Sequence, residues 1–137
     1  MGWLRMTVVW LVIIGVETVH GVVRSVLLAP YAGDLRSRQI GVLTGSCLIL
    51  WVAIATEGWR RANRLRVQIA TGAIWLLLTI AFEFCLGYYV LGLPWQRLTA
   101  DYDIARGGLL PFGLAALALS PLIAARLRKR RDGIRGR

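Results

Sequence analysis

Residues 4–28 read LRMTVVWLVIIGVETVHGVVRSVLL, an apolar run that also holds an acid, the chain's only histidine and two arginines. As an α-helix this run is about 37 Å long, enough to cross the ~30 Å hydrocarbon layer of a membrane. Three further apolar runs of similar length follow, at about residues 40–58, 67–92 and 109–125. We therefore predict an all-α polytopic membrane protein, with four transmembrane helices forming a single domain over residues 1–137.

The charge distribution indicates an orientation. The 137 residues are 57% hydrophobic and carry 17 basic against 7 acidic side chains, a net charge of +10. Bases gather at Arg5, in the loop of residues 59–66 and in the tail of residues 126–137. By the positive-inside rule these segments are cytoplasmic, so both termini are too. Almost all the bases are arginine, which hints at a GC-rich bacterial genome, and we predict the bacterial inner membrane. The charge is explained by topology, so no nucleic-acid partner is predicted.

The first helix carries a polar stripe. Glu17, His20, Gly21 and Arg24 lie at positions i, i+3, i+4 and i+7, and therefore on one helical face. Ionisable groups at membrane depth are costly, normally face the bundle interior and often mark a functional site.

The third helix offers a second acid, Glu83, followed four residues later by Gly87. Because both helices run outward, Glu17 and Glu83 should lie about 20–24 Å from the cytoplasmic edge. We expect the two acids to approach each other and Arg24 in the outer half of the membrane. The polar cluster is thus predicted to comprise Glu17, His20, Arg24 and Glu83.

Spans 1 and 3 resemble each other once these acids are aligned. Each has a tryptophan seven or eight residues before the acid, a glycine four after it, and a proline–aromatic pair at its end: Trp10, Glu17, Gly21 and Pro30-Tyr31 in one, Trp75, Glu83, Gly87 and Pro94-Trp95 in the other. Chance similarity and duplication both explain the match.

Several glycines are predicted to allow close packing. Gly41 and Gly45 form the small-residue spacing that lets two helix backbones approach. Gly21 and Gly87 should leave room beside the acids for a helix, a water or a ligand. In the fourth span, Pro121 is expected to kink or loosen the helix.

Residues 94–106 are predicted to form a short amphipathic helix on the outer membrane surface. Trp95, Leu98 and Tyr102 would face the membrane. The outer-surface polar residues are Arg97, Asp101, Asp103 and Arg106, which can pair as Arg97 with Asp101 and Asp103 with Arg106.

The polar cluster permits more than one function. It could bind or move a small ion, proton or polar solute. Alternatively, it could be a structural ion-pair network in a non-catalytic accessory or assembly subunit of a larger membrane complex. Glu17-x-x-His20 has the spacing of carboxylate-bridged metal sites, but the chain has one such motif and one histidine, so no metal or cofactor is predicted. No nucleophile–base pair or phosphate loop is evident, and Asp101 and Asp103 lie on different helix faces, so catalysis is unsupported.

Other expectations concern partners and the remaining polar groups. The basic tail should bind anionic lipid. Four short helices bury little interior, so a homo-oligomer or a larger complex is expected. We expect Cys47 and Cys85 to be buried thiols, and Glu57 to form an ion pair with Arg60 or Arg61 at the membrane interface. Lipid headgroups on the outer side should be contacted by Arg36, Arg38 and Gln39.

Overall fold

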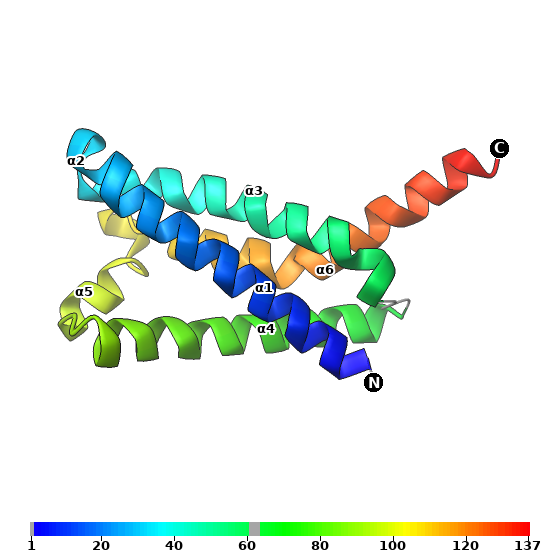
Figure 1. Cartoon of the computed structure of the whole chain (residues 1–137), viewed down its shortest axis with the longest axis horizontal. Coiled ribbons are helices and arrows are strands. Elements are labelled where there is room, and N and C mark those ends of the chain that lie inside the picture. The colour runs from blue at the N-terminus through cyan, green and yellow to red at the C-terminus, as the bar shows by residue number, and fades with distance from the viewer. Residues whose placement is uncertain (1, 61–63) are drawn as a thin grey trace.

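A computed structural model describes residues 2–60 and 64–137, which are mostly helical and include no β-strand. Figure 1 shows the order of the helices. The first long helix is α1 (Gly2–Val23) continued by a π-helical turn, η1 (Arg24–Leu28), and by α2 (Ala29–Ala32). Next come α3 (Asp34–Arg60), α4 (Leu65–Cys85) and a second π-helical turn, η2 (Leu86–Val90). The chain ends with α5 (Trp95–Ala100), a 3-10 turn, η3 (Ile104–Arg106), and α6 (Leu110–Arg135).

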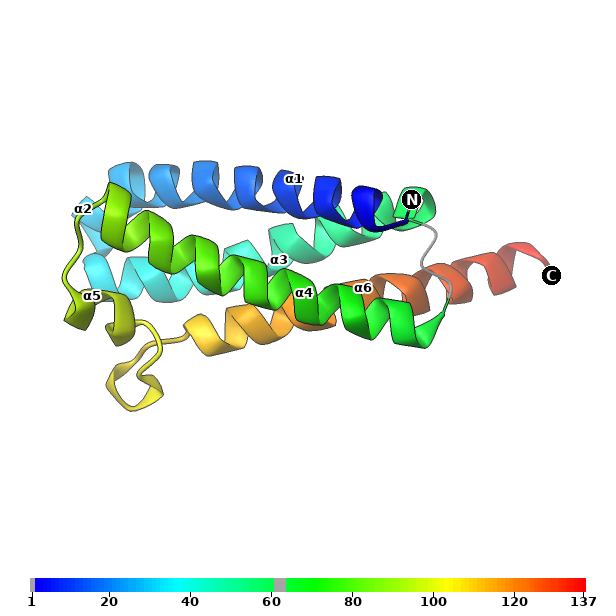
Figure 2. The same ribbon diagram turned by 90° about the horizontal axis from the view of Figure 1, so that it is seen from below.

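Four helical segments are long and apolar enough to cross a membrane, namely Gly2–Ala32, Asp34–Arg60, Leu65–Val90 and Leu110–Arg135. The predicted fold class, an all-α multi-pass membrane protein with four spans, is therefore confirmed. The two chain termini lie at the same end of the bundle, and α5 lies at the opposite end (Figures 1 and 2).

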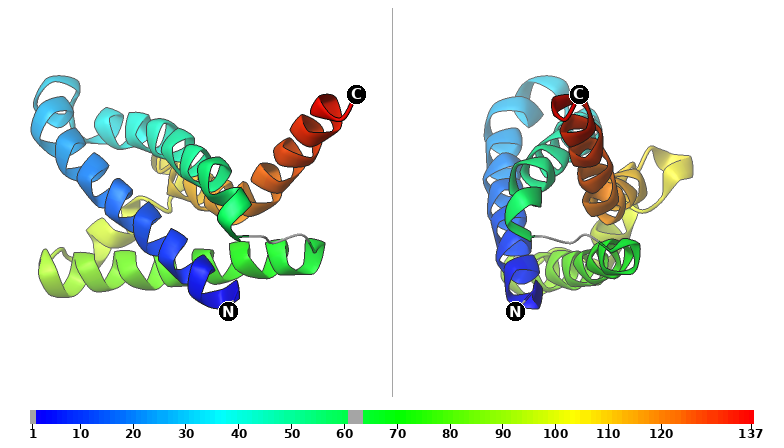
Figure 3. Two further views of the ribbon diagram at one scale, coloured as in Figure 1. Left: turned by 45° about the vertical axis from the view of Figure 1, so that its right-hand side comes forward. Right: turned by 90° about the vertical axis from the view of Figure 1, so that its right-hand side faces the viewer.

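The helices pack unevenly. α6 packs against both α3 and α4, and α1 packs mainly against α3. α1 crosses α4 near the end that holds the termini, and the two helices diverge toward the α5 end (Figures 1 and 3).

The first span is longer than predicted, because it passes through Pro30 instead of stopping before it. Proline has no N–H and its ring disturbs the preceding turn of a helix. Here the chain widens into the π-helical turn just before Pro30, where Ala29 N–H donates to the carbonyl of Arg24. The helix finally ends at Gly33, whose φ of 86° favours glycine.

The second and fourth helices also extend beyond their predicted limits. α3 begins at Asp34, so residues 34–39 form its first turns and not a loop. An acid in the first turn is favourable beside the helix N-terminus. α6 continues through the basic tail to Arg135. The tail is rich in good helix formers, and an ion pair of 3.7 Å joins Arg128 Nε to Asp132 Oδ2 within it.

Pro121 lies inside α6, which bends midway along its length (Figure 3). Proline cannot donate to the carbonyl four residues earlier, here that of Leu117. The Ser120 hydroxyl donates to the Leu117 carbonyl instead, at 2.7 Å. The carbonyl freed at the bend is therefore satisfied within the bundle.

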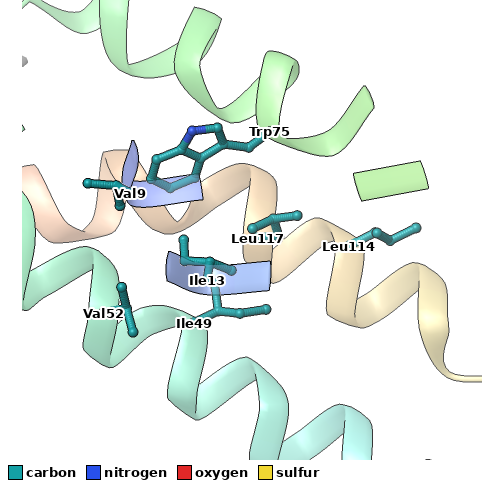
Figure 4. Close-up of a cluster of buried hydrophobic side chains, with 7 residues drawn as sticks. All are labelled: Val9, Ile13, Ile49, Val52, Trp75, Leu114 and Leu117. Atoms are coloured by element: carbon teal, nitrogen blue, oxygen red, sulfur yellow. The ribbon is translucent and has the colours of Figure 1, made fainter. Parts of the chain in front are cut away.

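The apolar core draws on all four spans (Figure 4). Its buried members are Val9 and Ile13 of α1, Ile49 and Val52 of α3, Trp75 of α4, and Leu114 and Leu117 of α6. The Trp75 indole donates to the Met6 carbonyl at 3.1 Å, which satisfies its only polar atom. The closest backbone approach is at Gly72, where a Cβ would overlap the Ala118 carbonyl. Sequence analysis did not single out this contact between α4 and α6.

The segment after the third span differs from the single helix predicted over 94–106. α5 ends at Ala100, and η3 is separate from it. The Asp101 and Asp103 carbonyls accept hydrogen bonds from Leu110 N–H and Gly108 N–H, at 3.2 and 2.8 Å. The chain therefore turns back toward α6 at this point, and the turn ends in Gly107 with a φ of 89°.

Candidate functional site: a polar cavity at the α5 end

A cavity of about 650 Å³ lies at the α5 end of the bundle, between α1–η1, α3, α4–η2, α5 and the start of α6. Four apolar residues from the core region also line it, namely Ile13, Ile49, Leu114 and Leu117. Volumes of about 300–1,000 Å³ are typical of small-molecule sites. All four members of the predicted polar cluster line this one cavity: Glu17, His20, Arg24 and Glu83.

Glu17 and His20 form a polar contact along α1 that continues onto α3. His20 Nδ1 lies 3.6 Å from Glu17 Oε2, and His20 Nε2 lies 2.7 Å from the Thr44 hydroxyl. The carboxylate rests against Gly45, where a Cβ would lie 2.7 Å from Glu17 Oε2. The other carboxylate oxygen, Glu17 Oε1, is buried and has no hydrogen-bond partner among the described residues.

Arg24 extends away from Glu17. Its side chain crosses α3 at Gly41, where a Cβ would lie 2.5 Å from Arg24 Cδ, and its Nη1 donates to the Ser37 hydroxyl at 3.3 Å. Ser37 and Gly45 are eight residues apart on α3, or about 12 Å along the helix axis. Arg24 makes no ion pair with the residues that the structure describes.

The glycines therefore have different environments from those predicted. At Gly41 and Gly45, the charged side chains of the first span take the space in which we expected a second helix backbone. The space that a Cβ at Gly87 would fill is taken by Leu98 of α5. Only Gly21 matches the expectation of open room beside the acid: it lines the cavity, and a Cβ there would meet nothing within 4 Å.

Glu83 faces the cavity from α4. Its side chain is exposed, and within the described ranges it has neither a hydrogen bond nor an ion pair. It lies within electrostatic range of Asp101, Glu17 and Arg24, as expected from the matched depth of the two acids. Glu17 and Glu83 thus face the same cavity, and neither forms a salt bridge with Arg24.

An arginine–aspartate network, formed by Asp34, Arg38, Arg97 and Asp101, connects α3 to α5 at the cavity's edge. Arg38 pairs with Asp34 at 3.0 Å and also with Asp101. Arg97 pairs with Asp101 at 3.3 Å and with Asp34 at 3.6 Å. Arg38, Arg97 and Asp101 also line the cavity. The predicted pair of Arg97 with Asp101 is confirmed, and the headgroup role of Arg38 stays a prediction.

Two other polar predictions at this end have separate outcomes. Asp103 and Arg106 form the expected pair at 3.5 Å, and both are well exposed. Gln39 does not face outward, because its Nε2 donates to the Gly107 carbonyl at 3.0 Å.

Tyr102 lines the cavity beside Glu83. Its ring stacks on Phe84 with centroids 5.6 Å apart and planes 15° apart. The Tyr102 hydroxyl is buried without a hydrogen-bond partner among the described residues. Burial raises the pKa of the Tyr102 phenol, and the charges of Glu83 and Asp101 raise it further.

Ser37 and Thr44 were not predicted from the sequence, and Arg38 and Tyr102 were predicted in other roles, as a headgroup contact and a membrane-facing side chain. A signal for the first two was present, because Ser37, Gly41, Thr44 and Gly45 recur at i, i+4, i+7 and i+8 and so define one face of α3. Arg38 and Tyr102 depend on how α5 folds back over the bundle, which no local pattern specifies.

The opposite end of the bundle holds a separate buried ion pair. Glu57 Oε2 and Arg60 Nη2 lie 2.5 Å apart, with side-chain exposures of only 4% and 0%. Arg60 also donates to the Ala53 carbonyl at 2.9 Å and lies 5.3 Å from the centre of the Trp75 ring. The predicted pairing of Glu57 with Arg60 is therefore confirmed, but the pair is buried inside the bundle, whereas we expected it at the membrane interface. Arg61, the other expected partner, lies outside the described residues.

Both cysteines are free and exposed, so the expectation of buried thiols is wrong. Among residues 2–60 and 64–137, no group of three or more histidine, cysteine, aspartate or glutamate side chains is arranged to hold a metal ion. Comparison of the chain with protein-family models, with curated proteins and with solved structures finds no match.

Proposed function

We propose that this membrane protein binds a small ion or polar solute in the cavity at the α5 end and moves it across the membrane. One observation carries the proposal: Glu17, Arg24 and Glu83 face a single cavity of about 650 Å³ without ion pairs among them. Charged groups within a membrane protein are costly unless they are paired or solvated. A bound solute or water would satisfy them.

The alternative, an accessory subunit whose cluster is a structural ion-pair network, has less support. A network of that kind requires Arg24 to neutralise Glu17 or Glu83. Arg24 instead donates to Ser37, and its stem lies across Gly41. The ion pair that does have a structural character is Glu57 with Arg60, at the other end of the bundle.

The contact of Glu17 with His20 suits proton exchange. The Thr44 hydroxyl lies 2.9 Å from the Ile40 carbonyl, to which it can donate its hydrogen. In that arrangement His20 Nε2 donates to Thr44, and His20 Nδ1 lies 3.6 Å from Glu17 Oε2, so the two groups can hold one proton between them after a small approach. We propose that this pair loses or gains a proton when solute enters or leaves.

Orientation and location belong to the same proposal. Arg5, Arg60, Arg64, Arg66 and the basic part of α6 lie toward the end that holds both termini. The positive-inside rule supports cytoplasmic termini, a cavity in the outer half of the membrane, and a bacterial inner-membrane location. The basic part of α6 is proposed to bind anionic lipid, and the bundle to form a homo-oligomer or join a larger complex.

The proposal is tested with purified protein in lipid vesicles. Four probes are followed separately: protons with a trapped pH-sensitive dye, and radiolabelled rubidium, glycine and methylamine. We expect at least one probe to cross faster than in protein-free vesicles, and Glu17→Gln and Glu83→Gln to abolish the difference. Asp103→Asn is the matched control, because Asp103 is an exposed acid at the same end that does not line the cavity. Correctly folded Glu17→Gln and Glu83→Gln proteins that match the wild type would refute the proposal.

A further inference from the structure

We infer that the solute bound in the cavity is a small organic cation with a single positive charge and an apolar body. The inference rests on the proposed function, in that it takes the cavity to be a solute site, and it adds the chemical class of the solute. Charge, hydrogen-bonding capacity and the apolar lining each support it.

The charge of the cavity points to a cation. The arginine–aspartate network is neutral by itself, because two arginines pair with two aspartates. The other charged groups that line the cavity are Glu17, Glu83 and Arg24. When the Glu17–His20 pair has lost the proton that we propose it exchanges, both acids are ionised and these three groups sum to −1. A net charge inside a membrane protein is unfavourable, so a monovalent cation completes the site.

The position of the negative groups in the cavity also favours a cationic solute. Glu17 lies at the level of Gly45, whereas the Arg24 guanidinium is directed to Ser37, about 12 Å away along α3. A cation beside Glu17 therefore avoids the one unpaired base of the cavity. Glu83 lines the same cavity as Glu17, so both acids can act on one positive group.

Two buried polar atoms in the cavity have no hydrogen-bond partner in the part of the chain that the structure describes. They are Glu17 Oε1 and the Tyr102 hydroxyl. Burying a polar atom without a partner is unfavourable, and native proteins rarely leave one unsatisfied. Glu17 Oε1 can only accept while ionised, so it requires a donor. An ammonium group supplies several donors and no acceptor.

The remaining surface of the cavity suits an apolar body. Phe82 and Phe84 line it together with Tyr102, and the stacked pair of Phe84 and Tyr102 lies next to Glu83. Aromatic faces attract cations as well as apolar groups. The site is therefore suited to an aromatic or aliphatic amine more than to a bare metal ion, which would need several oxygen ligands around it.

The test uses three probes with the same ring and different charge: benzylamine, benzyl alcohol and benzoate. Binding to the full-length protein in detergent is measured by isothermal titration calorimetry. We expect benzylamine to bind at least tenfold more tightly than benzyl alcohol, and benzoate not to bind. Glu17→Gln and Glu83→Gln should each weaken benzylamine binding at least tenfold, whereas Asp103→Asn should leave it unchanged.

The other outcomes are distinct. Tighter binding of benzoate that is lost in Arg24→Gln would overturn the cation assignment and leave the proposed solute site intact. Equal binding of all three probes would also overturn it, since charge would then play no part. If no probe binds, the inference fails, and the vesicle experiment decides separately whether the proposed function fails with it. Thermal unfolding of each variant in the same detergent identifies any loss of binding that comes from misfolding.

Discussion

Replacing Gly21 by leucine should block the cavity without harming the fold. Gly21 lies on α1 between Glu17 and Arg24, lines the cavity, and has no atom within 4 Å of the place where a Cβ would be. The four carbons of a leucine side chain take roughly the space of four waters, about 120 Å³ at ~30 Å³ each. That is roughly a fifth of the 650 Å³ cavity. Leucine is also favoured over glycine in a helix by about 0.6–1 kcal/mol.

The matched control is Gly15→Leu, the same substitution on the same helix. Gly15 is exposed, has open space around it and does not line the cavity. Steric overlap with a bound solute should cost about 1–3 kcal/mol, or roughly 5- to 150-fold in affinity. We expect Gly21→Leu to weaken benzylamine binding about tenfold or more, with a thermal midpoint no lower than that of the wild type. Gly15→Leu should bind normally. Equal binding by the two variants would refute the reasoning, as would equal loss in both.

Three further predictions concern stability, pH and lipid. Gly72→Ala should destabilise the protein by about 1–3 kcal/mol, because a Cβ at Gly72 would overlap the Ala118 carbonyl; a thermal midpoint equal to that of Gly21→Ala would contradict this. The raised pKa of Tyr102 means that the unfolded chain loses the phenol proton first as the pH rises above about 10, so wild-type stability should fall there relative to Tyr102→Phe. Thermal midpoints of the two proteins from pH 8 to 11 measure this, and a constant difference would be inconsistent with it. Lipid binding by the tail is tested by replacing five bases with glutamine: Arg126, Arg128, Lys129, Arg130 and Arg131. We expect less phosphatidylglycerol to be enriched around the purified protein, as measured by lipid mass spectrometry. Unchanged enrichment would argue against lipid binding by the tail.

The number and order of the spans could be predicted because long apolar runs have few alternatives in a membrane. Their ends could not. Proline usually ends or kinks a helix, yet the π-helical turn of Arg24–Leu28 continues the helix through Pro30. Residues 34–39 are polar and resemble a loop, but they pair with α5 and with the Gly107 carbonyl, contacts distant in sequence.

The shared face of Glu17, His20 and Arg24 follows from helical periodicity alone, and the structure places all three on one cavity. Whether Arg24 would pair with the acids could not be predicted from that face. The answer depends on Gly41, which leaves space for the Arg24 stem to cross α3, and on Ser37, whose hydroxyl accepts a hydrogen bond from the guanidinium. The turn at Asp101 and Asp103 was missed for a related reason, because its hydrogen bonds come from Gly108 and Leu110 downstream.

The proposed site requires that α1 present Gly21 to an open cavity next to Glu17. Cysteine accessibility tests it most directly, in a background in which Cys47 and Cys85 are replaced by serine. Gly21→Cys and Gly15→Cys proteins in lipid vesicles are treated with a water-soluble trimethylammonium methanethiosulfonate, which reacts with thiolates reached by water. We expect Gly21→Cys to react at least tenfold faster than Gly15→Cys, and faster with this cationic reagent than with its sulfonate analogue. Equal, slow reaction at both positions would contradict it.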